Sequence, residues 1–214
     1  CLARLGRYEQ AIADYDRAIE RNYTQAYLNR ANAYRAMGLR DRAMQDYHKV
    51  IELRPELAQA YYDRANLLVL TGQYDQALQD YDKAIDLNAD YAEAYANLGR
   101  LLQVERRPEE AQACLEQAIR LKPQMPQPHN NLGALLEAQG RFEEAAACYR
   151  QALRLDPGHA PAHNNLGNLL RSQGRLQEAL ACYEKALESQ PDYAEAHWNR
   201  ALALLVTGDF QHGW

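Results

Sequence analysis

Histidine and cysteine, two residue types that bind metal ions, recur in this sequence at a constant interval. Imidazole nitrogen and thiolate sulfur are the ligands of structural zinc, and thiols also form disulfides. Each column has three members spaced 34 residues apart. The histidine column is His129, His163 and His197, and the cysteine column is Cys114, Cys148 and Cys182.

Packing explains the histidine column, and the cysteine column is expected to be free thiols at the flank of the second helix. The histidine position holds Tyr27, Tyr61 and Tyr95 earlier in the chain, so it takes a flat ring at a helix interface. Equivalent residues of neighbouring repeats should lie about 8–10 Å apart, which is beyond disulfide reach. Neither CxxC nor HExxH occurs. We therefore expect no metal site, and reduced thiols that predict a cytoplasmic location. Earlier in the chain the cysteine position holds Asp14, Asp46 and Asp80.

The sequence also lacks the motifs of catalysis. It has no glycine-rich phosphate loop, nucleophile elbow or Ser/His/Asp order. The paired acids Glu109–Glu110 and Glu143–Glu144 are expected at helix starts, where the helix dipole favours negative charge. We therefore predict no enzymatic activity and no cofactor.

Charge and hydropathy exclude two kinds of partner. The net charge is −5 and the pI about 5.7, so nucleic-acid phosphates gain no electrostatic attraction. No segment approaches the about 20 apolar residues that cross a bilayer, and no signal peptide is apparent. We predict neither nucleic acid nor membrane as a partner. Both ends of the chain fall inside the repeat pattern, so we expect a fragment of a longer protein.

Carboxamides form the third column, which we call the asparagine column. Asparagine carries one acceptor oxygen and two N–H donors. A row of them can pair with the N–H and C=O groups of an extended polypeptide, whatever its side chains. The alternative is that these side chains are solvated or bond to a neighbouring turn. The column consists of Asn29, Asp63, Asn97, Asn131, Asn165 and Asn199.

The elements that position these columns follow from a repeat with a period of 34 residues, shortened once to 32. A period of this size is typical of solenoids built from helical pairs. Alanine recurs at Ala11, Ala43, Ala77, Ala111, Ala145 and Ala179, with a ring or leucine four residues later. A glycine precedes the alanine by five residues at Gly6, Gly38, Gly72, Gly140 and Gly174. A proline ends the repeat at Pro55, Pro123, Pro157 and Pro191.

Residues 126–159 show how one repeat should fold. Apolar and small residues spaced i, i+3, i+4, i+7 from His129 predict a first helix. Gly140 allows the positive φ of a tight turn. Phe142, Ala145 and Tyr149 begin the apolar stripe of a second helix, which Pro157 ends. Because one pair cannot bury its own apolar face, it must stack on its neighbours.

These repeats resemble tetratricopeptide repeats over essentially the whole chain, in segments such as "APAHNNLGNLLRSQGRLQEALACYEKALESQP". The resemblance implies an all-α fold, a right-handed α-solenoid or superhelix of stacked helix–turn–helix repeats. Two departures are Arg106 in place of the turn glycine, with Pro108 restarting the helix, and Ala89 in place of the terminal proline. The expected ranges in the single array 1–214 are a partial repeat at 1–23, complete repeats at 24–57, 58–91, 92–125, 126–159 and 160–193, and a truncated repeat at 194–214.

In such solenoids the first helices line the concave side. The asparagine column resembles the asparagine ladder of superhelical arrays of the O-linked N-acetylglucosamine transferase type, which implies an extended polypeptide in the groove. A lysine- and arginine-rich clamp for a C-terminal carboxylate is not expected, although Arg100 or Arg171 can pair with an acidic side chain. Residues expected beside the column are Asn32, Asn66, Arg100, Asn130, Asn164, Asn168 and Arg171.

We therefore predict a protein–protein interaction scaffold that binds an extended peptide or partner helix. Two alternatives remain at this stage. One is the substrate-recruiting arm of a larger glycosyltransferase, since the tail "LALLVTGDFQHGW" resembles the last repeat of bacterial tetratricopeptide proteins that lead into a further domain. The other is self-assembly into a homo-oligomer through the array ends, where Leu202, Leu204 and Val206 are expected to be partly exposed.

Overall fold

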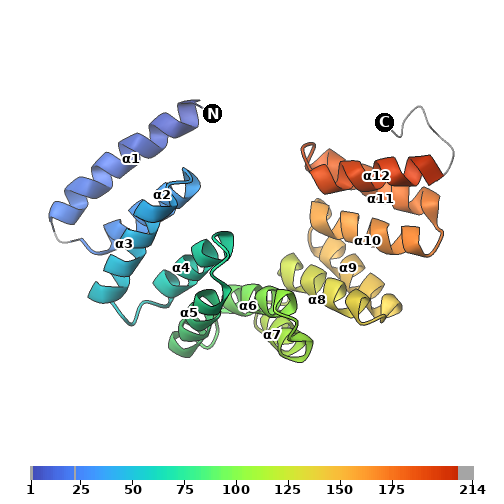
Figure 1. The fold of residues 1–214 in the computed structure, drawn as a ribbon, viewed down its shortest axis with the longest axis horizontal. Coiled ribbons are helices and arrows are strands. Elements are labelled where there is room, and N and C mark those ends of the chain that lie inside the picture. Colours follow the sequence, from blue (N-terminus) through green and yellow to red (C-terminus); the bar gives the residue numbers. More distant parts are fainter. Residues whose placement is uncertain (1, 22, 207–214) are drawn as a thin grey trace. The chain divides into compact units, whose positions relative to one another are not determined.

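The computed structural model describes residues 2–21 and 23–206, and this part of the chain contains helices but no β-strand. The helices follow one another through short connections (Figure 1). They are α1 (Leu2–Glu20), α2 (Gln25–Ala36), α3 (Arg40–Leu53), α4 (Ala58–Leu70), α5 (Tyr74–Leu87), α6 (Ala92–Val104), α7 (Pro108–Leu121), α8 (Pro126–Ala138), α9 (Phe142–Leu155), α10 (Ala160–Ser172), α11 (Leu176–Ser189) and α12 (Ala194–Val206).

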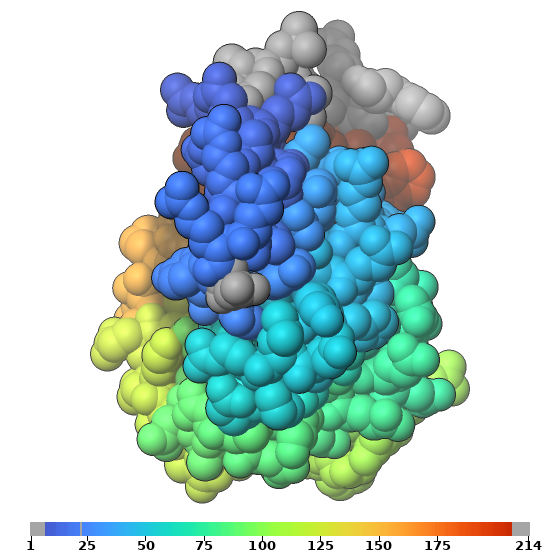
Figure 2. Space-filling view, turned by 90° about the vertical axis from the view of Figure 1, so that its left-hand side faces the viewer, coloured from blue at the N-terminus to red at the C-terminus, as the bar shows by residue number. Residues whose placement is uncertain are grey.

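The chain divides into two compact units, residues 1–101 and residues 102–214, which we call the N-terminal and C-terminal units. In the N-terminal unit α2 packs on α3, α3 on α4 and α4 on α5. On the surface of this unit the colours follow the sequence from blue through cyan to green (Figure 2). In the C-terminal unit the same order runs from α7 to α12. First helices also touch first helices, as α2 touches α4 and α10 touches α8 and α12. The predicted all-α solenoid of helix–turn–helix repeats is therefore confirmed within each unit.

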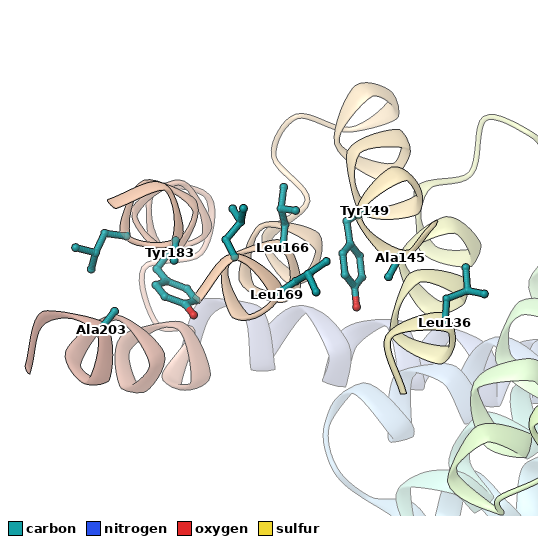
Figure 3. Close-up of a cluster of buried hydrophobic side chains, with 11 residues drawn as sticks. Leu136, Ala145, Tyr149, Leu166, Leu169, Tyr183 and Ala203 are labelled. Carbon is teal, nitrogen blue, oxygen red and sulfur yellow. The ribbon is translucent and has the colours of Figure 1, made fainter. Parts of the chain in front are cut away.

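Small residues opposite large rings bring the two helices of a repeat together. In the C-terminal unit Tyr149 and Tyr183 are fully buried, and Figure 3 shows them among leucine and alanine side chains from neighbouring helices. A Cβ atom added to Gly133 would lie 2.6 Å from Cε1 of Tyr149, and one added to Gly167 would lie 2.6 Å from Cε1 of Tyr183. Only glycine lets the tyrosine rings lie this close to the first helix.

The turns inside the repeats use the left-handed backbone conformation. Gly38, Gly72, Gly140 and Gly174 have φ of 78°, 75°, 77° and 76°. Arg106, which replaces the glycine in its repeat, adopts φ of 58°. A residue with a Cβ atom has a steric penalty in this left-handed conformation, which glycine avoids.

The first helix departs from the simple repeat pattern. Gly6 does not form a turn, because it lies within α1, which runs unbroken from Leu2 to Glu20. A helix tolerates an internal glycine at a cost of about 1 kcal/mol. The expected repeat at 194–214 is described as far as Val206, and Gly213 and Trp214 lie outside the described residues.

Candidate binding surface

We define the first-helix surface as the face of the first helices that carries the asparagine column and its flanking residues. In the N-terminal unit, side chains of this surface are linked by hydrogen bonds to one another and to Tyr47 of the second helix α3. The hydroxyl of Tyr47 donates to Oδ1 of Asn32 at 2.6 Å, and Nδ2 of Asn32 donates to Oδ2 of Asp63 at 3.2 Å. Nε2 of Gln59 also donates to Oδ2 of Asp63, at 3.0 Å. Asp63 is only 4% exposed, so neutral amides solvate its carboxylate inside the protein.

The next repeat of the N-terminal unit repeats this arrangement with carboxamides. The hydroxyl of Tyr81 donates to Oδ1 of Asn66 at 2.7 Å, and Nδ2 of Asn97 donates to the same oxygen at 2.8 Å. The same Nδ2 lies 3.2 Å from the hydroxyl of Tyr62. A member of the asparagine column therefore bonds to the residue three positions after the column member of the preceding repeat.

The C-terminal unit connects its repeats through a different acceptor. Nδ2 of Asn165 donates to Oδ1 of Asn130 at 3.1 Å, and Nδ2 of Asn199 donates to Oδ1 of Asn164 at 3.0 Å. These acceptors are 7% and 1% exposed. Nδ2 of Asn130 lies 3.4 Å from Oδ1 of Asn131. In each "HNN" sequence the first asparagine is therefore a buried acceptor for the following repeat, and the second belongs to the asparagine column.

The predicted site residues thus fall into two groups. The buried members are Asp63, Asn130 and Asn164. The members that reach solvent, wholly or in part, are Asn29, Asn32, Asn66, Asn97, Arg100, Asn131, Asn165, Asn168, Arg171 and Asn199. Contact with a ligand stays a prediction for all of them, and only the second group is open to direct contact.

Each histidine of the column contacts a backbone carbonyl oxygen at the end of the preceding repeat. Nε2 of His163 lies 2.9 Å from the carbonyl oxygen of Pro157, and His129 and His197 make the same contact six residues back, at 3.1 Å and 2.8 Å. The hydroxyl of Tyr61 donates to the carbonyl of Pro55 at 3.1 Å, so tyrosine serves equally well. Burial lowers the pKa of His163, which favours the neutral ring. Within residues 2–21 and 23–206, no three His, Cys, Asp or Glu side chains are grouped as a metal would require.

In the N-terminal unit the position of the cysteine column holds an aspartate that forms an ion pair, which sequence analysis missed. Nε and Nη2 of Arg64 donate to the two carboxylate oxygens of Asp80 at 2.7 Å each, and Arg30 holds Asp46 in the same way. The sequence signal was the separation of 16 residues between each arginine and its aspartate.

In the C-terminal unit, leucine and cysteine occupy these two positions. Leu132, Cys148 and Cys182 pack against the core cluster that contains Leu166. Burial raises the pKa of the thiols of Cys148 and Cys182, which favours the unreactive protonated form. None of the three cysteines of the column forms a disulfide with another described residue. The column therefore contributes to packing.

No helix in the described residues is long and apolar enough to cross a membrane.

Comparison with known proteins agrees with this architecture. YrrB, described as a TPR protein with an unusual peptide-binding site, is 29% identical, with a TM-score of 0.61 over 85% of this chain and 95% of its own. TTC0263, a thermophilic TPR protein of Thermus thermophilus, is 27% identical, with a TM-score of 0.73 over 85% of this chain and 99% of its own. A chain of the APC/C hetero-tetramer Cut9–Hcn1 shares the fold at 19% identity, with a TM-score of 0.86 over 99% of this chain and 42% of its own.

No curated protein sequence matches the chain. A family model does, over residues 3–211, and its description is the cilia and flagella-associated protein 70 C-terminal domain, a TPR domain. The solved relatives carry the same helical pairs, and the fold is that of protein–protein interaction scaffolds. The chain therefore belongs to the tetratricopeptide-repeat proteins, in the family of the cilia and flagella-associated protein 70 C-terminal domain.

Proposed function

We propose that this chain recognises an extended segment of a partner protein on its first-helix surface and performs no catalysis of its own. The observation that carries the proposal is the fixed orientation of the carboxamides. Asn165 and Asn199 each donate one hydrogen bond to the preceding first helix, and Asn97 donates two, to Asn66 and Tyr62. A ligand would meet side chains whose rotamers are already chosen.

Hydrogen-bonding capacity remains after these bonds are made. A carboxamide has two N–H donors and an oxygen with two lone pairs, so Asn165 and Asn199 keep an N–H and the oxygen for a ligand backbone, and Asn97 keeps its oxygen. Immobilising a flexible side chain on binding costs about 0.5–1.5 kcal/mol. The bonds between repeats remove much of that cost in advance.

Repeat spacing also suits an extended polypeptide. Neighbouring first helices pack about 8–10 Å apart, which is close to three residues of an extended chain at about 3.3 Å each. The peptide-binding site named in the description of YrrB supports a peptide ligand for this chain as well. The glycosyltransferase arm and self-assembly through the ends remain predictions.

The test uses peptides selected by phage display of a random dodecapeptide library on the intact chain. Affinities of the selected peptides are then measured for the wild type and for the triple variant Asn97→Ala, Asn131→Ala, Asn165→Ala. We expect affinity to fall at least about tenfold, the equivalent of about 1.4 kcal/mol. The helical circular dichroism signal should be retained.

A matched control removes exposed amides from second helices, through Gln45→Ala and Gln79→Ala. This control should bind like the wild type. Equal affinity of the triple variant and the control would overturn the proposal.

A further inference from the structure

Arg171, on the first-helix surface of the C-terminal unit, has no carboxylate partner among the described residues, whereas Arg30 and Arg64 of the N-terminal unit each have one. Arg30 and Arg64 have side chains 18% exposed, and each is held by both oxygens of an aspartate. Arg171 is also part-buried, and its Nε is buried without a hydrogen-bond partner among the described residues. Because no carboxylate of the described residues neutralises this guanidinium and the residue is part-exposed, its outer N–H groups can donate to a negatively charged ligand.

The surroundings of Arg171 fix a second donor beside it. Asn168 lies one helical turn earlier, and its Oδ1 accepts a hydrogen bond of 2.9 Å from the hydroxyl of the buried Tyr183. With its oxygen engaged, the carboxamide of Asn168 has its N–H groups left to donate. Burial raises the pKa of Tyr183, and the positive charge of Arg171 acts to lower it.

The preceding repeat adds a charge of the opposite sign. Glu137 occupies the position of Arg171 one repeat earlier, and its Oε2 accepts a hydrogen bond of 2.7 Å from the hydroxyl of Tyr149. In Figure 3 the rings of Tyr149 and Tyr183 point their hydroxyl oxygens to the same side. Both tyrosines therefore support polar side chains of successive first helices.

We propose that Arg171 and Asn168 form a recognition position for the carboxylate of an Asp or Glu side chain in an extended polypeptide. This proposal rests on the proposed function and names its ligand class. Guanidinium and carboxylate make paired, charge-assisted hydrogen bonds, and the N–H of Asn168 supplies a further donor. Glu137 would disfavour a second acidic residue about three positions away along the ligand.

The N-terminal unit offers a natural comparison. Asn32, Arg35 and Tyr47 repeat the same residue types, and Nε of Arg35 is likewise buried without a partner among the described residues. There, however, Nδ2 of Asn32 already donates to the buried carboxylate of Asp63. That carboxylate would repel a second one, so we expect Arg35 to contribute less to binding an acidic side chain.

The experiment measures fluorescence anisotropy with two labelled, end-blocked probe peptides that contain one Glu or one Gln in an otherwise identical serine- and alanine-rich dodecapeptide. Blocked ends remove the terminal carboxylate. We expect the wild type to bind the Glu peptide at least about tenfold more tightly than the Gln peptide. Arg171→Gln should abolish that preference, Arg171→Lys should keep part of it, and Arg35→Gln should change it by less than about threefold. Arg150→Gln, at an exposed second-helix position, is the control and should behave like the wild type.

Equal affinity for the two peptides in the wild type, or equal preference in Arg171→Gln and Arg150→Gln, would overturn the proposal. If the asparagine triple variant still weakened binding of both peptides in that case, the proposed function would stand while this inference failed. Absence of binding of both peptides at millimolar concentration would count against both.

Discussion

Replacing Arg64 and Asp80 by leucine and cysteine, as in Arg64→Leu and Asp80→Cys, would give an N-terminal repeat the pair that the C-terminal repeats carry. Leu132 and Cys148 have the same separation of 16 residues as Arg64 and Asp80. If the two pairs are alternative solutions to the same packing position, each single change should be costly and the double change should be tolerated.

The geometry sets the expected size of each effect. The Arg64 and Asp80 side chains are 18% and 8% exposed, and two bonds of 2.7 Å join them. Removing one partner from a buried ion pair costs about 3–5 kcal/mol because the other charge stays buried without compensation. Arg64→Leu should therefore cost about 3 kcal/mol. Asp80→Cys should cost about 2 kcal/mol, since the longer arginine can turn towards solvent.

The double variant should cost about 1 kcal/mol, because two apolar side chains fit the site but fill less volume. The coupling energy of the double-mutant cycle would then be about 4 kcal/mol. Urea unfolding of the intact chain measures it. The matched control is Arg154→Leu with Gln151→Ala, an exposed pair in which Arg154 donates to Gln151 at 2.9 Å, where the coupling should be near zero.

A second measurement reports on the same site independently. Burial lowers the pKa of His48; the charge of Arg64 lowers it further and that of Asp80 raises it. The NMR titration of His48 should therefore move to higher pH in Arg64→Leu and to lower pH in Asp80→Cys. Additive stability costs together with an unchanged His48 titration would refute the reasoning that these two residues act as one unit.

Further predictions concern single positions. Burial lowers the pKa of His163 from its ordinary value of 6.5, so below that pH the unfolded chain binds a proton that the folded chain excludes. The free energy of unfolding should therefore fall as the pH drops below about 6.5. His163→Tyr should reduce the difference between the urea midpoints at neutral and mildly acidic pH, and an unchanged difference would contradict this cause. Gly140→Ala should cost about 1 kcal/mol, because φ is 77° while no atom lies within 4 Å of the added Cβ. Arg106→Gly should raise the melting temperature, because glycine adopts the φ of 58° without steric cost. If Arg106→Gly lowered the melting temperature as Gly140→Ala does, a conformational origin would be refuted. Gly167→Ala should cost about 1–3 kcal/mol because its Cβ would lie 2.6 Å from Cε1 of Tyr183, and combining it with Tyr183→Leu should reduce the cost.

The helical pairs could be predicted because their signals are local and repeated. In the stretch 126–159 the apolar spacing gave the two helices, Gly140 their turn and Pro157 their end, and α8 and α9 occupy 126–138 and 142–155. Gly133, which belongs to that apolar spacing, lies against the ring of Tyr149. Gly6 shares the spacing of the turn glycines but lies inside α1, so the spacing alone does not predict a turn.

The hydrogen bonds between repeats could not be read in the same way. Periodicity tells which face of a helix a residue occupies, but not which side chain of the neighbouring repeat it meets. The asparagine column was assigned to the ligand groove, and the structure adds that Asn97 and Asn165 donate to the preceding first helix. The sequence did hold a signal, because an acceptor asparagine stands either directly before the column or three positions after it.

The two hydrogen-bonding schemes show which positions differ between the two units and which are shared. Column asparagines donate in both units, while the acceptor moves from Asn66 for Asn97 to Asn130 for Asn165. At Asp63 the direction is reversed, and the column member accepts from Asn32. The packing beneath changes with it, from an arginine–aspartate pair to leucine and cysteine. Changes confined to acceptor and packing positions leave the donor column presenting the same face. Under the proposed function, the donor positions would serve the backbone that all extended ligands share, and Arg171 would distinguish ligands by their charge.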